Sequence, residues 1–212
     1  MTDALFSFEH VRLEIGDTVL LDGVDLEIEA GRLVAISGPS GAGKSTLLRL
    51  CNRLEVPTSG VVRLCGADLS TLEARVVRRR VGMVFQRPTP FAGSVADNLR
   101  VADPALDDEG CRALLDEVNL PNGLLDREAS DLSGGEAQRA CLARTLATHP
   151  EVILMDEPTS SLDESHARSL ESLARSLVGG GVSVIWVSHD QDQIARVADQ
   201  VIRMERGLVV AQ

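Results

Sequence analysis

One stretch near the start of the chain constrains the fold more than any other. Residues 38–45 read GPSGAGKS, a G-x-x-x-x-G-K-S pattern that follows the apolar run 33–36 and precedes TLLRL at 46–50. A buried strand, a glycine loop and a helix in this order are the context in which such a loop binds phosphate. Glycine accepts the positive φ that lets backbone N–H groups surround an anion, and the helix dipole points at the same anion. A chance glycine-rich turn is the alternative, but all eight residues and both flanks match the phosphate loop.

The loop predicts how a nucleotide is held. We expect Lys44 to reach the β and γ phosphates and the Ser45 hydroxyl to ligate Mg²⁺. The predicted nucleotide-binding residues of this stretch are Gly38, Pro39, Ser40, Gly41, Ala42, Gly43, Lys44, Ser45 and Thr46.

Length and charge limit the class of protein. The 212 residues suffice for one core with a small inserted subdomain, so two full domains are not expected. Lys and Arg number 21 against 32 Asp and Glu, which gives a formal net charge of −11. Because this charge opposes the counterion release that drives most nucleic-acid binding, we expect no nucleic-acid partner.

Cysteines and apolar runs indicate the surroundings of the chain. The cysteines lack the spacing of zinc ligands, and we expect them to be small core residues in a reducing compartment. They are Cys51, Cys65, Cys111 and Cys141. The N-terminus has no basic region leading into an apolar stretch, and no segment approaches 18 uninterrupted apolar residues. We therefore expect a soluble chain that acts on a membrane only through a separate spanning partner.

Hydrophobic periodicity separates strands from helices. Period-2 alternation in 5–15 and 24–28 predicts half-buried antiparallel strands. Apolar runs predict further strands at 33–37, 61–65, 81–85, 152–155 and 182–187, and the first of them is expected to be a central parallel strand covered on both faces. Strand signals vanish between Arg87 and Leu132, where 94–102 and 107–120 are expected to be helices of an insertion. A helix that carries apolar residues from Leu170 to Leu177 and a closing hairpin of 201–204 with 208–210 complete the pattern.

Two adjacent carboxylates follow an apolar strand. Asp156 and Glu157 end the run 152–156, and open α/β sheets bind ligands at the carboxyl ends of their strands. Asp156 is suited to orient Mg²⁺ or its waters, which leaves Glu157 to polarise an attacking water. A strand that simply ends in solvated acids is the alternative, but the phosphate loop in the same chain favours the catalytic interpretation.

A second helix start has the chemistry of an anion site. Ser133 and Glu136 fit a capping box at the start of a helix, which on its own is a structural feature. Gly134 and Gly135 between them would expose the helix N-terminus closely enough for an anion. Since the phosphate loop covers one side of a nucleotide, this second element indicates that the nucleotide is sandwiched.

These motifs together resemble the nucleotide-binding subunit of an ABC transporter over essentially the whole chain. In order they are the phosphate loop, Gln86, the signature LSGGEAQR at 132–139, Asp156–Glu157, Ser161–Leu162–Asp163, and His189. The resemblance implies an α/β P-loop NTPase fold with a RecA-like parallel sheet core, an N-terminal antiparallel β subdomain and an inserted α-helical subdomain. One ABC ATPase domain would occupy 1–212, with its core in 1–86 and 133–212 and its helical insertion in 87–132.

The resemblance also implies roles for single residues. Two subunits would pair head to tail when they bind ATP, so that the signature of one contacts the γ-phosphate held by Lys44 of the other. The signature residues are Leu132, Ser133, Gly134, Gly135 and Glu136. Gln86 would join the insertion to the nucleotide and, with Ser45 and Asp156, ligate Mg²⁺. Asp163 would bridge the two active sites and His189 would touch the γ-phosphate. A lone histidine after a strand is usually structural, but its place at the ligand end of the sheet favours function.

Within the superfamily, three short stretches resemble the small ATPase subunits of FetA-type exporters, which are associated with iron export and work with a separate permease. They are 86–91, 161–165 and 186–190. This resemblance implies an ATPase on the cytoplasmic face of the cell membrane, docked to its integral membrane permease through Gln86 and 87–98. An ABC ATPase that signals to envelope enzymes without moving a solute is the alternative. A single-site P-loop kinase is opposed by Ser133–Glu136 and by the absence of an evident acceptor site.

One position departs from the pattern. ABC subunits usually place an aromatic residue upstream of the phosphate loop to stack on adenine, and the matching residue here is Ile15. The chain has no tyrosine, so Phe6 or Phe8 is the alternative stacking residue. We expect binding to survive on the phosphate contacts and to discriminate poorly between ATP and GTP.

Overall fold

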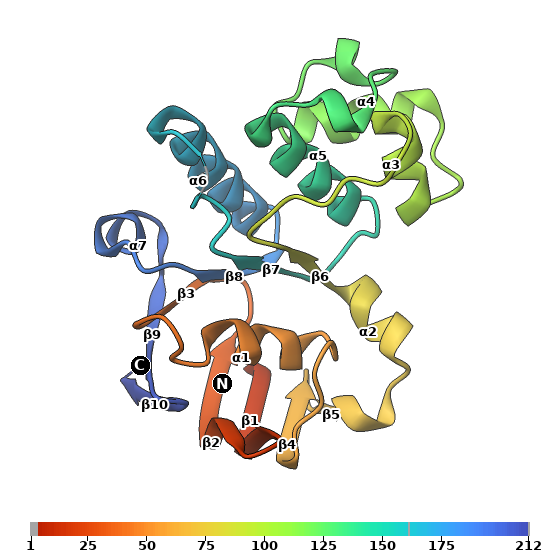
Figure 1. The fold of residues 1–212 in the computed structure, drawn as a ribbon. Helices are drawn as coiled ribbons and strands as arrows, with labels where there is room; N and C mark the ends of the chain where they lie inside the picture. Colours follow the sequence, from red (N-terminus) through yellow and green to blue (C-terminus); the bar gives the residue numbers. More distant parts are fainter. Residues whose placement is uncertain (1–3, 161, 212) are drawn as a thin grey trace.

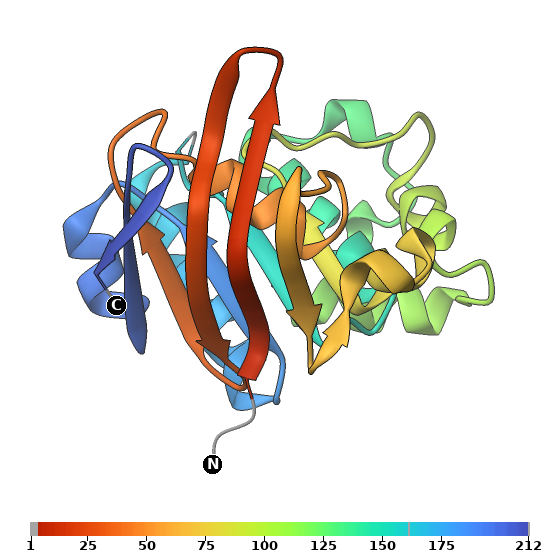
Figure 2. The ribbon, with the colours of Figure 1, turned by 90° about the horizontal axis from the view of Figure 1, so that it is seen from below.

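The N-terminal part of the chain forms an antiparallel sheet. The structure is a computed structural model, and it describes residues 4–160 and 162–211. Strands β1 (Ala4–Ile15) and β2 (Thr18–Glu29) make a long hairpin, which β4 (Ser59–Leu64) and β5 (Ala67–Asp68) extend. The strand order is β2-β1-β4-β5, and every pair is antiparallel (Figure 2). This confirms the predicted antiparallel sheet.

A second sheet of six strands forms the centre of the molecule (Figure 1). Its strands, in the order β10-β9-β3-β8-β7-β6, are all parallel except β10, which closes a hairpin with β9. Their bounds are β3 (Leu33–Ser37), β6 (Val81–Val84), β7 (Val152–Asp156), β8 (Ser183–Val187), β9 (Gln200–Glu205) and β10 (Leu208–Ala211). The predicted parallel core and closing hairpin are confirmed.

The two faces of the central sheet are buried in two different cores. Along β7 and β8 the side chains alternate, so that Leu154 and Ile185 point into one core while Met155 and Trp186 point into the other. The first core also takes α1 (Lys44–Cys51) and the inner face of the antiparallel sheet. The second takes helices α3 (Val95–Ala102), α4 (Asp108–Glu117), α5 (Gly134–Leu146) and α6 (Glu164–Gly179). Two buried faces explain why these strands are continuously apolar.

The predicted helical segment has its two helices, α3 and α4, and both pack on α5. The division of the chain at residues 86 and 133 stays a prediction, because α5 contacts these helices and the core strand β6 as well. The remaining helices are short: α2 (Ala74–Arg80), α7 (Gln191–Val197) and the 3₁₀ turns Leu69–Thr71, Asn122–Leu124 and Ala129–Asp131. In the part of the chain that is described, no helix has the length and apolarity to cross a membrane.

The prediction for one cysteine was wrong. Cys51, Cys111 and Cys141 are buried, whereas Cys65 is exposed. Cys65 and Gly66 form the two-residue turn between β4 and β5, and both have positive φ, 49° and 78°. A tight hairpin turn of this kind leaves the strand ends and directs its side chains into solvent, so a small apolar residue there is not part of a core.

Candidate functional site

The phosphate loop connects β3 to α1 as the sequence predicts. Gly38, Gly41 and Gly43 all have positive φ, at 145°, 78° and 96°. A Cβ on Gly38 would lie 2.1 Å from the carbonyl oxygen of Met204, and one on Gly43 would lie 2.9 Å from that of Leu20. These two glycines are therefore required by close backbone contact as well as by φ. A Cβ on Gly41 would meet nothing within 4 Å, so Gly41 is required by its backbone conformation alone.

Lys44 lies inside the curve of the loop. Its side chain is buried, and Nζ donates hydrogen bonds to the carbonyl oxygens of Gly38 and Pro39, both at 2.9 Å. Within 4–160 and 162–211, no carboxylate lies at salt-bridge distance from this ammonium group. A cation whose hydrogen-bond partners are neutral carbonyls is available to an anionic ligand.

Ser45 and Asp156 meet although 111 residues separate them. The Ser45 hydroxyl donates to Oδ1 of Asp156 at 2.8 Å, which joins the start of α1 to the end of β7. Burial raises the pKa of the Asp156 carboxyl, and the hydrogen bond from Ser45 partly opposes that rise. A hydroxyl and a carboxylate are both oxygen ligands of the kind that Mg²⁺ prefers, so this pair fits the predicted metal site.

Glu157 is joined to Gln86 and His189. Nε2 of Gln86 donates to Oε2 of Glu157 at 3.4 Å and to Oγ of Ser160 at 3.3 Å. Nδ1 of His189 lies 3.6 Å from the same Glu157 oxygen. Glu157 itself has φ of 45°, which a residue with a side chain rarely adopts. The backbone at the end of β7 thus has an uncommon conformation at the residue that Gln86 and His189 both approach.

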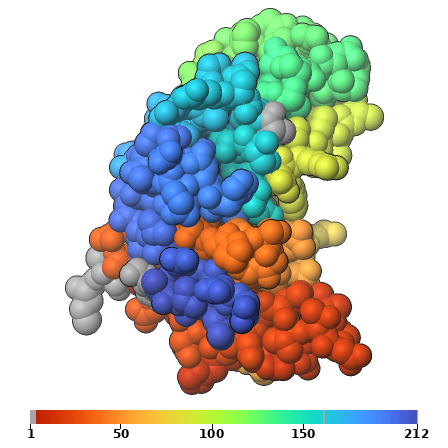
Figure 3. All heavy atoms as spheres, turned by 60° about the vertical axis from the view of Figure 1, so that its left-hand side comes forward, coloured from red at the N-terminus to blue at the C-terminus, as the bar shows by residue number. Residues whose placement is uncertain are grey.

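Two neighbouring cavities surround these groups. One, of about 360 Å³, is lined by the loop from Ser40 to Thr46 together with Leu20, Gln86 and Glu157. The other is lined by Ser37, Gly38, Pro39, His189, Gln191 and Arg203. In the space-filling view, the phosphate-loop segment in orange lies beside the C-terminal segment in blue, between the N-terminal sheet and the helices (Figure 3). Leu20, Gln191 and Arg203 were not predicted. Leu20 and Arg203 lie far from any motif in the sequence, and Gln191 follows His189 by two residues without belonging to the motif.

The signature residues lie away from their own phosphate loop. None of 132–136 lines either cavity, and α5 belongs to the core on the opposite face of the central sheet from α1 (Figure 1). The predicted capping box is confirmed: Ser133 N–H and Oγ both donate to Oε2 of Glu136, at 2.8 and 2.7 Å, and the Glu136 N–H donates to Ser133 Oγ at 3.4 Å. These bonds lower the pKa of the Glu136 carboxyl, the side-chain bond from Ser133 most.

Asp163 lies beside the signature in the same chain. It is the N-cap of α6 and accepts hydrogen bonds from the backbone N–H of His166 at 3.0 Å and from Oγ of Ser165 at 2.9 Å. Nδ1 of His166 is 2.6 Å from its other oxygen, and together these contacts lower the pKa of Asp163, the backbone bond most. A Cβ on Gly135 would lie 3.3 Å from the His166 ring, so Asp163 and the signature are neighbours. Ser161, the first residue of the predicted 161–163 motif, lies outside the described residues.

The predicted adenine-stacking position is exposed. Ile15 ends β1 with 57% of its surface accessible, and it lines neither cavity. Phe6 and Phe8 were the alternatives, but they are 0% and 2% exposed in the core beneath the antiparallel sheet. Neither ring reaches the surface, so the alternative that one of them replaces the missing aromatic residue is not supported.

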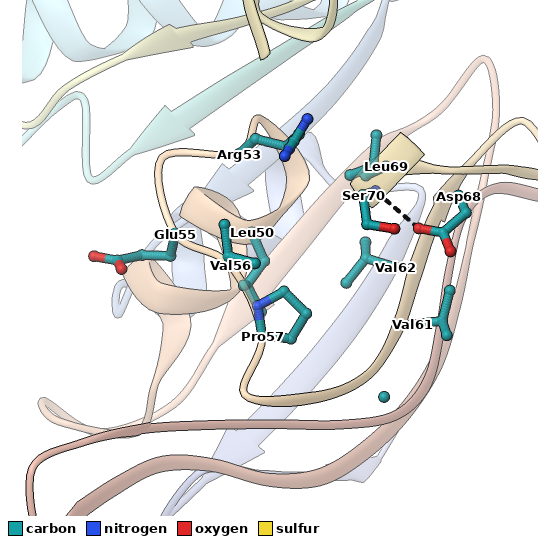
Figure 4. Close-up of a pocket in the computed structure, with 11 residues that line it drawn as sticks. Leu50, Arg53, Glu55, Val56, Pro57, Val61, Val62, Asp68, Leu69 and Ser70 are labelled. Carbon is teal, nitrogen blue, oxygen red and sulfur yellow. Dashed lines mark hydrogen bonds between the residues drawn. The ribbon is translucent and has the colours of Figure 1, made fainter. Parts of the chain in front are cut away.

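A further cavity, of about 210 Å³, lies between the end of α1 and the antiparallel sheet (Figure 4). Its lining is mostly apolar and includes Leu50, Pro57 and Val62. The carboxylate of Asp68, which also lines it, accepts a hydrogen bond from the Ser70 N–H at 2.8 Å. It shares no lining residue with the phosphate-loop cavity, so it is not part of the nucleotide site.

Comparisons with known proteins show the family of this chain. The family model for ABC transporters matches residues 21–160. Protein STAR1 of Oryza sativa subsp. japonica is 44% identical over 204 residues, which cover 94% of this chain and 59% of STAR1. The probable iron export ATP-binding protein FetA of Escherichia coli is 38% identical, covering 95% of this chain and 91% of FetA. Phosphate import ATP-binding protein PstB 3 of Natronomonas pharaonis is 40% identical, covering 91% and 74%.

A solved structure shows the same fold. CbiO1 from Clostridium perfringens, described as part of the ABC transporter complex cbiONQ, aligns with a TM-score of 0.88 at 27% identity over 99% of this chain and 88% of CbiO1. The chain therefore belongs to the ABC transporter family and has the fold of its nucleotide-binding subunits. It is an ABC ATPase, the ATP-binding subunit whose hydrolysis of ATP drives transport.

Proposed function

We propose that the chain works as a pair of identical subunits, arranged head to tail around two ATP molecules, and drives a separate integral membrane permease. The observation that carries this proposal is that the phosphate loop and the signature lie apart within one chain. Lys44, Ser45 and Glu157 line one cavity, whereas Ser133–Glu136 begin a helix on the opposite side of the central sheet. A signature that cannot serve its own phosphate loop is explained if it serves the loop of a partner.

We propose a role for each residue of the site. Lys44 binds the β and γ phosphates through its ammonium group, and His189 contacts the γ-phosphate. Ser45, Asp156 and Gln86 would hold Mg²⁺, which when bound neutralises charge on those phosphates. Glu157 accepts a proton from the water that attacks the γ-phosphorus, as the bond between that phosphorus and the oxygen of the departing ADP breaks. Gln86 donates to the Glu157 carboxylate and so aims it, while Asp163 bridges to the partner site.

The permease would dock where the segment after Gln86 meets α5. Phe91 is 51% exposed, and the guanidinium carbon of Arg144 lies 4.4 Å from its ring centroid. Arg144 also donates to the carbonyl oxygen of Thr89 and to Oδ1 of Asn98, both at 3.2 Å. A groove lined by Met83, Phe91 and Val101 runs beside this cluster. The docking segment is thus fastened to the helix that begins with the signature, and the chain would lie at the cytoplasmic face of the cell membrane.

We propose iron export as the transport that this ATPase drives, because the stretches 86–91, 161–165 and 186–190 resemble the FetA-type subunits and FetA is 38% identical to this chain. STAR1 and a phosphate importer match at similar identity, so the solute needs a direct measurement. The native complex should contain a polytopic permease, and vesicles carrying both subunits should move Fe²⁺ and not phosphate in an ATP-dependent manner. Phosphate movement would refute iron export alone. A bitopic partner tied to a wall enzyme would refute transport in favour of signalling.

The head-to-tail arrangement has its own test. Ser133→Arg should abolish hydrolysis while each monomer still binds ATP, and Lys44→Ala should lose nucleotide affinity. A mixture of the two variants can form pairs that keep one composite site intact, with phosphate loop from one chain and signature from the other. ATP-dependent pairing that returns only in the mixture, measured by size-exclusion chromatography, is the expected result. If the mixture behaves as the sum of the two inactive variants, the two motifs act within one chain and the proposal is wrong.

A further inference from the structure

A buried polar network joins the segments that follow the predicted catalytic residues Glu157 and His189. Its centre is Gln193 in α7, which is 3% exposed. The Gln193 amide oxygen accepts a hydrogen bond from Nε1 of Trp186 at 3.2 Å, and its nitrogen donates to Oγ1 of Thr159 and to Oε1 of Glu171, both at 3.0 Å. One side chain therefore joins α7, β8, α6 and the loop that follows β7.

The partners fix the orientation of the Gln193 amide. The indole N–H of Trp186 is only a donor, so the amide oxygen must face it. The Glu171 carboxylate is only an acceptor while ionised, so the amide nitrogen must face it. Burial raises the pKa of Glu171, but the hydrogen bonds from Arg196 and Gln193, together with the charges of Arg196 and Arg168, leave that pKa lowered. Because both ends of the Gln193 amide have fixed partners, the hydrogen bond from its nitrogen to Thr159 fixes the position of Thr159 as well.

The network touches both segments that carry the proposed chemistry. Thr159 is two residues beyond Glu157, whose positive φ requires support from its surroundings. Gln193 is four residues beyond His189, in the helix that Asp190 caps by accepting a hydrogen bond from the Gln193 N–H at 3.0 Å. Gln193 lines neither of the two cavities at the phosphate loop; it lines a different cavity, with Thr159 and Glu171.

We propose that Gln193 is a positioning residue, which sets the place of Glu157 relative to His189 by tying the loop after β7 to the start of α7. This inference rests on the proposed roles of Glu157 and His189. It predicts an effect on turnover and none on nucleotide affinity, because the side chains of the network do not line the phosphate-loop cavity and Lys44 is held by Gly38 and Pro39.

The first test is Gln193→Leu, which keeps an apolar stem of similar length and removes both ends of the amide. A displacement of the catalytic groups by about 1 Å typically costs about 10²-fold in rate, so kcat should fall by about that factor while the Kd for ATP stays within about twofold. Arg168→Gln is the matched control, since Arg168 is exposed and its guanidinium is 3.9 Å from Glu171, and it should leave kcat unchanged. A folded Gln193→Leu protein with parental kcat, or with Kd weakened as much as kcat, would overturn the proposal.

The second test does not depend on how well Gln193→Leu folds. Gln193→Glu places a carboxylate against Glu171, and two adjacent buried carboxylates cannot both ionise, so its kcat should be low at neutral pH and recover as pH falls. Adding Glu171→Gln exchanges the two groups and restores a donor opposite an acceptor. The double variant should regain kcat at neutral pH. If it stays as slow as the single variant while circular dichroism shows both folded, the amide orientation does not matter and the proposal is wrong.

One comparison separates this inference from the roles on which it rests. Glu157→Gln is assayed beside the Gln193 variants under the same conditions. If Glu157→Gln keeps parental turnover, the proposed role of Glu157 fails, whatever Gln193 does. If Glu157→Gln is inactive and Gln193→Leu is fully active, only the positioning role fails.

Discussion

Replacing Ile15 with tyrosine should tighten ATP binding. The Ile15 side chain is 57% exposed at the tip of the β1–β2 hairpin, so a larger ring displaces no packed neighbour and should cost little stability. Stacking of a base on an aromatic side chain is typically worth about 1–3 kcal/mol, which corresponds to a gain of roughly five- to 150-fold in affinity. The gain should appear for ATP with the Mg²⁺ requirement unchanged, because the phosphate loop is untouched.

Equilibrium titration of both proteins with ATP and GTP measures this effect. Val19→Tyr is the matched control, because Val19 is 42% exposed on the same hairpin and pairs with Glu14, one residue before Ile15. It adds an aromatic ring nearby and should leave affinity unchanged. The parent should bind ATP and GTP with similar affinity. Strong preference for ATP in the parent, with no gain in Ile15→Tyr, would show that another group holds adenine, and that group is neither Phe6 nor Phe8 since both are buried.

Two further predictions concern the base and the thiols. Glu157→Gln should keep ATP binding and lower kcat by about 10²–10⁴-fold, because the amide has the shape of the carboxylate without its basicity. Size-exclusion chromatography with ATP and Mg²⁺ should then show a persistent dimer. Parental turnover would show that Glu157 is not the general base. Cys65 is the exposed cysteine, while burial raises the pKa of Cys51 and of Cys141, so a thiol reagent should modify one cysteine in the folded protein and all four after denaturation. Rapid modification of a second thiol without unfolding would contradict the burial of the other three.

The sequence predicted the parts of this structure that are set by local rules. The glycines at 38, 41 and 43 and the Ser133–Glu136 box are local, and each is formed as expected. The bond between Ser45 and Asp156 joins residues 111 positions apart, and it was foreseen only through the motifs on either side. The placement of Arg203 and Leu20 depends on strand order, which hydrophobic periodicity does not specify.

The features that the sequence did not predict also depend on structure beyond local patterns. Helix α7 has seven residues, too few for a periodic pattern, so Gln193 had no helical face on which to be recognised. Strand β2 begins at Thr18, earlier than the predicted 24–28, because 18–23 do not alternate strictly in polarity although they pair with β1. The exposure of Cys65 followed from a two-residue turn, whose position depends on where β4 and β5 pair.

Trp186 gives the molecule a built-in optical probe. It is the only tryptophan in a chain without tyrosine, so near-ultraviolet emission comes almost entirely from one indole. That indole is fully buried in β8, three residues before His189, and its N–H is bonded to Gln193. Because indole emission responds to hydrogen bonding and local polarity, its wavelength and intensity report on one place in the fold. A rearrangement near the proposed γ-phosphate site on nucleotide binding would therefore be followed in real time in the unlabelled protein.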